Sequence, residues 1–252
     1  MTGNLGIVDW GIGGLGVVSE LRALCTEKGL VLPAISYLSD TAAAPYGTLS
    51  ARTLEARLRL AIGFLRDRGA SRILLACNAA STALPRLSDL DDVRGVIAPT
   101  LELISESRKS ARIVVIGGRR TILSRVYASA LRARGFDVVQ RIAQPLSGFI
   151  ERGEQSSPAF EQAVSRILRP VMHYNALVLA CTHYPAALPT FEKHFTGQVI
   201  NPLPAIARAC CSTNLSRRDE DDAFFTTGDT QAMKLAAAKA WQIEITAKKA
   251  EI

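Results

Sequence analysis

The sequence predicts an α/β protein made of two similar domains, each a mostly parallel sheet flanked by helices. Strand-like and helix-like segments alternate along nearly the whole chain, which favours parallel sheets. Two short apolar runs, 73–78 and 177–182, each end at a cysteine followed by a small polar residue, a pattern typical of buried parallel strands. The two runs lie about one small domain's length apart. An ancient duplication with pseudo-two-fold symmetry would account for that spacing.

The first half contains the expected strands and helices in alternation. Residues 5–9 form the first expected strand, and a glycine-rich turn over 11–14 opens a helix that continues to about Lys28. Ser50 can cap a long helix whose apolar residues recur at helical spacing until Gly69 stops it. The other strands of this half are expected at 33–38, at the first cysteine run, and at 95–98 before Pro99.

The second half repeats this plan. A strand is expected at 112–116, followed by a glycine turn and a helix over 121–134 that Gly135 ends. The further elements are expected in the order strand 136–140, helix 157–172, the second cysteine run and strand 199–200. A strand at 223–227 and a helix at 230–240 form a tail that is too short for a domain of its own. We therefore expect this tail to pack on one of the two halves.

The composition is that of an ordinary globular protein. Hydrophobic residues make up 48% of the 252 residues and charged residues 21%, which leaves ample material for a core. No apolar run approaches the roughly 18 residues that span a membrane. Residues 1–4 contain no basic segment of the kind that begins a signal peptide. We therefore expect a cytoplasmic protein that does not interact with membranes.

Cysteine content and charge narrow the function further. Five cysteines without framework spacing should be free thiols in a reducing compartment, and the three histidines have no metal-ligand spacing relative to them, so we expect no metal site. The net charge of +7 would suit an anionic partner, but no nucleic-acid module signature is present. We expect a small-molecule substrate and no nucleic acid, and a homodimer would agree with the commonest oligomeric state.

The two cysteine runs place thiols where chemistry is expected. In open α/β sheets ligands bind beyond the carboxyl ends of the strands, and Cys77 and Cys181 stand there. Each thiol also lies near a helix start, whose positive dipole end would favour a thiolate. His183 could share a proton with Cys181, and Asp9 at the tip of the first strand could orient a base or bind an amine. Two thiols that face one cleft could act as a paired acid and base.

Each of these residues also has a structural interpretation. A strand cysteine usually packs as a small hydrophobe, a lone histidine is more often structural, and an aspartate after a strand often caps a turn. The turn Gly11-x-Gly13-Gly14 could present backbone N–H groups to an anion, but it lacks the full spacing of a dinucleotide site. Two cysteines in equivalent places are harder to explain by packing alone, so the functional interpretation is favoured.

Four ordered motifs carry a family resemblance. They are Gly6-Ile7-Val8-Asp9-x-Gly-x-Gly-Gly-Leu15, Asp40-Thr41-x3-Pro45-Tyr46-Gly47, Ala76-Cys77-Asn78-x-Ala80-Ser81 and Ala180-Cys181-Thr182-His183-Tyr184-Pro185. Smaller similarities lie at 121–127, 145–151, 200–202 and 226–229. Together they cover nearly the whole chain in collinear order. The set resembles the motifs of glutamate racemases, in the aspartate/glutamate racemase family.

The resemblance implies two α/β domains, 1–98 with 209–252 and 99–208, with the active site between them. It also implies a cofactor-independent isomerase that interconverts L- and D-glutamate and supplies D-glutamate for peptidoglycan, and hence for cell-wall biogenesis and cell shape. One cysteine thiolate would remove the α-proton while the other thiol protonates the opposite face. The residues implied in catalysis are Cys77, Cys181, Asp9 and His183. Those implied in substrate binding are Trp10, Tyr46, Gly47, Asn78, Ala79, Thr182, Thr121 and Glu151, of which Glu151 could also assist Cys181.

Two residues depart from the family pattern inside the site. The family typically has serine where this chain has Trp10 and threonine where it has Ala79, and both missing hydroxyls normally contact the substrate. An indole also adds bulk, so Trp10 either narrows the pocket or points away from it. Three functions stay open: glutamate racemisation with reshaped binding, the same chemistry on aspartate or another small carboxylate, and a non-catalytic binding protein. Retention of both cysteines with Asp9, Thr182 and His183 argues against the third.

Overall fold

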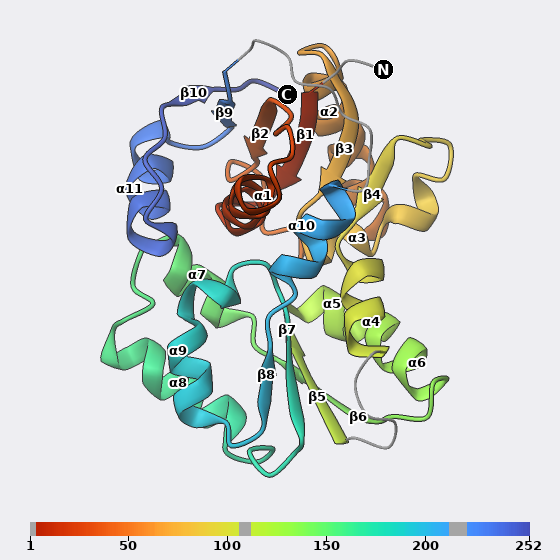
Figure 1. Ribbon diagram of the computed structural model, residues 1–252, viewed down its shortest axis with the longest axis vertical. Coiled ribbons are helices and arrows are strands. Elements are labelled where there is room, and N and C mark those ends of the chain that lie inside the picture. Colours follow the sequence, from red (N-terminus) through yellow and green to blue (C-terminus); the bar gives the residue numbers. More distant parts are fainter. Residues whose placement is uncertain (1–3, 106–111, 212–220) are drawn as a thin grey trace.

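The computed structural model describes residues 4–105, 112–211 and 221–252, and the strands within these residues form two separate sheets (Figure 1). The first sheet has the order β10-β9-β2-β1-β3-β4 and the second the order β6-β5-β7-β8. All the pairs of neighbouring strands in these described residues run parallel, which confirms the predicted α/β class. The strands are β1 (Asn4–Asp9), β2 (Ile35–Ser39), β3 (Ala70–Leu75), β4 (Val93–Gly95), β5 (Arg112–Gly117), β6 (Asp137–Ile142), β7 (Ala176–Ala180), β8 (Gln198–Ile200), β9 (Ala223–Thr226) and β10 (Ala247–Lys249).

The C-terminal tail returns to the first sheet, as expected for a segment too short to fold alone. β9 pairs with β2, with Phe225 opposite Leu38, and β10 extends the sheet beyond β9. The first sheet thus combines strands from 4–95 and 223–249, whereas the second takes its strands from 112–200. The domain boundaries after residues 98 and 208 stay predictions.

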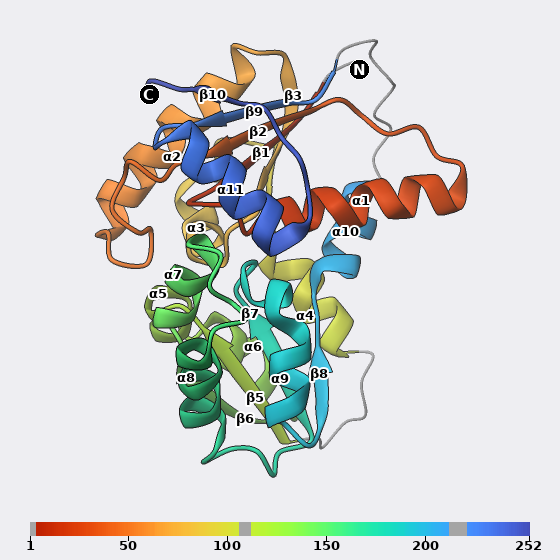
Figure 2. The same cartoon turned by 90° about the vertical axis from the view of Figure 1, so that its left-hand side faces the viewer.

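Helices cover both faces of each sheet (Figure 2). Alternate residues of β5 show why: Val114 and Ile116 pack toward α7, α8 and α9, whereas Ile113 and Val115 pack toward α4 and α6. The helices are α1 (Leu15–Lys28), α2 (Ala51–Arg66), α3 (Asn78–Ser81), α4 (Ile97–Ser105), α5 (Arg119–Leu123), α6 (Val126–Arg132), α7 (Pro145–Glu151), α8 (Pro158–Leu168), α9 (Leu188–His194), α10 (Leu203–Cys211) and α11 (Thr230–Trp241), with 3₁₀ turns η1 (Leu84–Arg86) and η2 (Tyr184–Ala187). The cluster that contains α1, α10 and α11 continues into α7, α8 and α9, so the two halves share a core.

Several predicted elements differ from the structure. The strand expected at 95–98 is β4 at Val93–Gly95, and α4 begins at Ile97. Pro99 fits the first turn of α4, because the N–H groups of that turn have no intrahelical acceptor. The single helix expected at 121–134 is divided into α5 and α6, because Arg125 adopts a left-handed conformation with φ 58°. Helix α7 and strand β10 were not predicted.

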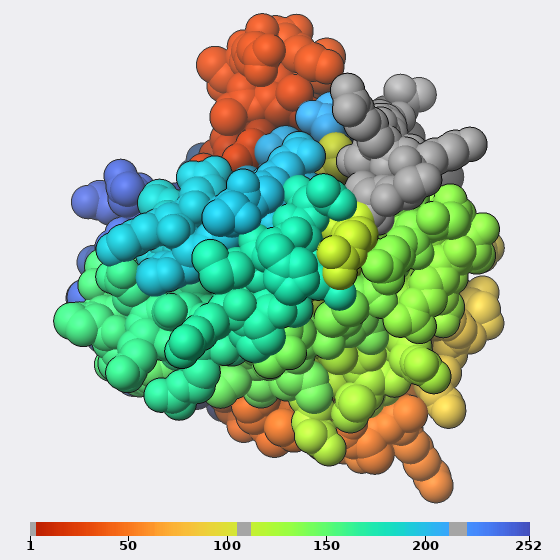
Figure 3. All heavy atoms as spheres, turned by 90° about the horizontal axis from the view of Figure 1, so that it is seen from below, coloured from red at the N-terminus to blue at the C-terminus, as the bar shows by residue number. Residues whose placement is uncertain are grey.

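Helix α1 extends beyond the sheet that it covers. Its buried residues end at Cys25, and the end of the helix with the following loop projects from the molecule (Figure 3). Only the beginning of α1, next to the glycine turn, therefore approaches the strand ends. None of the helices in the described parts of the chain is long and apolar enough to cross a membrane.

Candidate active site

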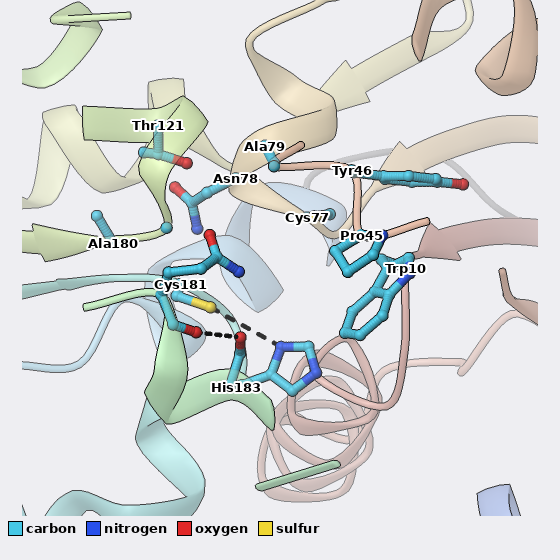
Figure 4. Close-up of a pocket in the computed structure, with 14 residues that line it drawn as sticks. Trp10, Pro45, Tyr46, Cys77, Asn78, Ala79, Thr121, Ala180, Cys181 and His183 are labelled. Atoms are coloured by element: carbon cyan, nitrogen blue, oxygen red, sulfur yellow. Dashed lines mark hydrogen bonds between the residues drawn. The ribbon is translucent and has the colours of Figure 1, made fainter. Parts of the chain in front are cut away.

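Both cysteine thiols lie at carboxyl ends of central strands and line one pocket between the two sheets (Figure 4). Cys77 follows the end of β3 and Cys181 directly follows β7. The other lining residues are Trp10, Pro45, Tyr46, Gly47, Asn78, Ala79, Gly118, Thr121, Gln144, Ser147, Ala180 and His183. Every residue predicted for the site lines this pocket except Asp9, Thr182 and Glu151, which lie directly behind it.

Cys77 is a protonated thiol at neutral pH. Burial raises its pKa well above the ordinary value, and the charge of Asp9 raises it further, while the N–H groups of Ala79 and Ala80 lower it less. The helix start at Cys77 therefore acts in the expected direction, but burial and the charge of Asp9 outweigh it. The physical reason is that α3 has only 4 residues, so its dipole is short, whereas the carboxylate is a full charge in a desolvated site.

Cys181 has a cationic neighbour instead. Its Sγ lies 3.8 Å from Nδ1 of His183, and Nε2 of His183 lies 2.5 Å from Oε1 of Glu151. Burial opposes protonation of His183, but the hydrogen bonds to Cys181 and Glu151 and the charge of Glu151 outweigh it, so the pKa of His183 lies well above its ordinary value. An imidazolium against Sγ can hold a proton at Nδ1 and stabilise negative charge on the sulfur. The two thiols therefore have opposite electrostatic surroundings.

The glycine turn after β1 contacts the pair formed by Glu151 and His183. The backbone N–H of Ile12 donates to Oε1 of Glu151 over 2.6 Å, which fixes the carboxylate that orients His183. A Cβ at Gly13 would lie 2.5 Å from Nδ1 of His183, so no larger residue fits there without displacing the imidazole. The turn thus allows segments far apart in the sequence to meet closely at the site.

Asp9 is a completely buried carboxylate. Its oxygens accept hydrogen bonds from the Trp10 backbone N–H over 2.6 Å and the Thr182 hydroxyl over 3.1 Å. Burial raises its pKa to about 6; the charge of Glu151 adds to this rise, while His183 and the two hydrogen bonds oppose it. Asp9 is therefore ionised at neutral pH and protonated in mildly acidic solution.

Asn78 offers an unused donor to the pocket. Its Oδ1 accepts a hydrogen bond of 2.6 Å from the Tyr127 hydroxyl, whereas its buried Nδ2 has no partner within the described residues. The side chain lies between Thr121 and Cys181 (Figure 4). A buried donor without a partner is costly, so Nδ2 is suited to binding a substrate carboxylate oxygen.

Trp10 lines the pocket and does not point away from it. Its Nε1 donates to the carbonyl oxygen of Ala43 over 3.0 Å, so the indole cannot replace the missing serine as a donor to substrate. Tyr46 also lines the pocket, but its hydroxyl donates to Asp40 over 2.8 Å. The segment that contains Ala43 and Tyr46 can therefore bind substrate only through its backbone and ring surfaces. Ala79 adds a methyl group to the same wall.

Sequence reasoning missed Gln144 and Ser147. They lie at the beginning of α7, a helix that was not predicted, and the similarity at 145–151 was the only signal for this region. Oε1 of Gln144 accepts a hydrogen bond of 2.9 Å from the Arg119 backbone N–H, and the Ser147 hydroxyl donates to the Gln144 carbonyl oxygen. Across the described residues, no three His, Cys, Asp or Glu side chains converge on a point that could hold a metal ion.

Two facing α/β halves with a pair of cysteine thiols at one pocket are consistent with a racemase, an isomerase. The family model described as Asp/Glu/Hydantoin racemase matches residues 5–210, and the chain belongs to that family.

Known proteins agree with this assignment. The chain is 35% identical to a glutamate racemase of Methylococcus capsulatus over 90% of this chain and 84% of that protein. It is 31% identical to a glutamate racemase of Desulforudis audaxviator over 94% and 93% of the two chains. The crystal structure of a glutamate racemase isoform from Bacillus anthracis superposes with a TM-score of 0.87 at 25% identity, covering 99% of this chain and 98% of that one.

Proposed function

We propose that this racemase interconverts L- and D-glutamate, with Cys77 and Cys181 as the two acid/base groups. The observation that carries the proposal is the presence of both thiols in one pocket with opposite electrostatic surroundings, a carboxylate near Cys77 and an imidazolium at Cys181. One thiol in its acid form and one in its base form are what a single racemisation event needs.

The proposed chemistry uses one thiol as the base and the other as the acid. In one direction the Cys181 thiolate takes the α-proton and forms an S–H bond, while the electron pair stays on the α-carbon. Cys77 then gives its proton to the opposite face and becomes the thiolate. In the reverse direction Cys77 is the base, and Asp9, whose charge acts on Cys77, assists it. His183 holds a proton against Cys181 throughout, oriented by Glu151.

The carbanion must be stabilised by groups that are already in place. The free Nδ2 of Asn78 can bind an oxygen of the α-carboxylate, and Gly47 and Gly118 bring the backbone close to the same pocket. The walls formed by Trp10, Pro45 and Ala79 exclude water from the planar intermediate. A location in the cytoplasm and a homodimeric assembly stay predictions, and supply of D-glutamate for peptidoglycan is the role general to glutamate racemases.

Exchange of the α-proton tests this function directly. In D₂O the protein is expected to remove the α-proton NMR signal of both L- and D-glutamate, because each thiol takes protons from one face and returns solvent deuterium. Aspartate, incubated in parallel, tests the other substrate that the sequence left open. Absence of exchange with glutamate would overturn the proposal, and exchange with aspartate alone would assign the site to the shorter substrate.

Changes at Trp10 and Ala79 test whether these residues limit glutamate binding. The double variant Trp10→Ser/Ala79→Thr is expected to lower KM for glutamate about tenfold, because it restores two hydroxyl donors to a site for a charged substrate. Trp10→Phe is the matched control, since it keeps the ring and removes only the donor to Ala43. If the double variant has the KM of the wild type, the missing hydroxyls are not what limits binding.

A further inference from the structure

One arginine, next in sequence to the pocket residue Thr121, links the two halves of the molecule. Arg120 lies on α5, which follows strand β5 of the second sheet, yet its side chain reaches two segments that connect strands of the first sheet. Its Nε donates to the Thr82 hydroxyl over 2.8 Å, and its Nη1 donates to the carbonyl oxygen of Leu49 over 2.9 Å. A single guanidinium therefore joins the two halves of the molecule at three points of the chain.

Each of these three points is close in sequence to a residue that lines the pocket. Arg120 is the neighbour of Thr121, which lines it, and Leu49 comes shortly after Gly47, which also lines it. Thr82 ends the short helix α3 that begins at Asn78, and its hydroxyl donates to the carbonyl oxygen of Ala79 over 2.7 Å. Movement of Arg120 away from its acceptors would thus free three segments that carry pocket residues.

We propose that Arg120 is a positioning residue that fastens the active-site cleft in its closed form by bridging Thr82 and Leu49. The proposal rests on the racemase function proposed above, because that chemistry needs a pocket that opens to admit substrate and closes around the carbanion.

The side chain of Arg120 forms hydrogen bonds to neutral oxygens, and such contacts can break and re-form in every turnover. Within the described residues Arg120 forms no salt bridge, and both of its acceptors are neutral oxygens. Burial and the charge of Arg86 lower its pKa, so the guanidinium receives no electrostatic support at this place. Arg57 shows the contrast: it binds both carboxylate oxygens of Asp40 within the first half, where nothing has to separate.

Loss of the fastening should appear in KM. Without Arg120 the closed form is less populated before substrate binds, and the apparent affinity falls in proportion to that population. Once substrate is bound its own contacts hold the cleft shut, so kcat changes little. We expect Arg120→Ala to raise KM about five- to tenfold, about the net contribution of one hydrogen bond, with kcat within about twofold.

The matched control is Arg119→Ala, which removes the same charge from the same helix while the backbone N–H of residue 119 still reaches Gln144. It should leave KM unchanged. Arg120→Lys should give an intermediate KM, because an ammonium keeps the charge but lacks the fixed planar fork with which the guanidinium reaches both acceptors. Thr82→Val should raise KM in the wild type and have little further effect in Arg120→Ala if the two residues act as one contact.

Amide hydrogen exchange provides a readout that does not depend on turnover. In Arg120→Ala the segments 45–50 and 78–83 should exchange faster than in the wild type, and in Arg119→Ala they should not. Unchanged exchange and unchanged KM in Arg120→Ala would overturn the fastening role, as would an equal rise of KM in Arg119→Ala. Failure of the wild type to exchange the α-proton of glutamate would instead overturn the proposed function, and the amide exchange would still test the fastening.

Discussion

Cys77→Ala and Cys181→Ala are each expected to lower the rate of racemisation by about 10³-fold or more, because one face of the α-carbon then has no acid or base. Neither change should unfold the protein, since each thiol borders the pocket and is not embedded in the core. The measurements are the rate of D-glutamate formation from L-glutamate and the midpoint of thermal unfolding. Cys210→Ala, which removes a thiol on α10 outside the pocket, is the matched control and should keep full activity.

The two variants should also differ from each other in a defined way. Each retains one thiol, so in D₂O each should still exchange the α-proton of one enantiomer without inverting it, since proton removal and deuterium return occur on the same face. The variant that exchanges L-glutamate must leave D-glutamate untouched, and the other variant must show the reverse. Exchange of the same enantiomer by both variants, or full activity in either, would exclude the two-thiol mechanism.

Most of the fold can be predicted from local patterns in the sequence. The apolar runs before Cys77 and Cys181 predict two strands of the sheets. Because each cysteine follows such a strand, the sequence also predicts that both thiols lie at the carboxyl ends of parallel strands. The break at Arg125 could not be predicted, because arginine favours helices and no local pattern marks the left-handed conformation that it adopts. That the carboxyl ends of the two sheets face each other was implied by the family resemblance, because no local sequence pattern determines how two sheets are placed relative to one another.

The properties that decide reactivity were less predictable, because they depend on burial and on residues far away in sequence. The helix start beside Cys77 suggested a thiolate, but desolvation and the charge of Asp9 reverse that expectation. Trp10 could have pointed either way, and its direction is set by the carbonyl oxygen of Ala43. Arg120 gave no signal at all in the sequence, because its acceptors at Leu49 and Thr82 lie in other segments of the chain.

Asp9→Asn is expected to stabilise the fold and to reduce activity at the same time. Burial raises the pKa of Asp9 from its ordinary value of 3.8 to about 6 in the folded protein. At neutral pH the folded protein therefore carries a buried carboxylate that the unfolded chain would hold in water. Two pKa units correspond to about 3 kcal/mol, an upper value for what asparagine can recover. Its amide can keep both hydrogen bonds, accepting from the Trp10 N–H and donating to the Thr182 hydroxyl.

The pH dependence gives the sharper test of this role. Between about pH 4 and pH 6 the folded protein holds a proton on Asp9 that the unfolded chain has lost, so the free energy of unfolding falls as pH rises through this window. In Asp9→Asn this fall should be absent, and the variant should unfold at a higher temperature than the wild type at pH 7.

If ionised Asp9 assists Cys77, kcat/KM of the wild type should fall as pH decreases through about 6. The Asp9→Asn variant should lack that inflection, and its kcat should be lower by about 10²-fold. A variant that is no more stable than the wild type at pH 7 would show that the carboxylate is not desolvated, and an inflection near pH 6 that persists in the variant would assign the titration to another group.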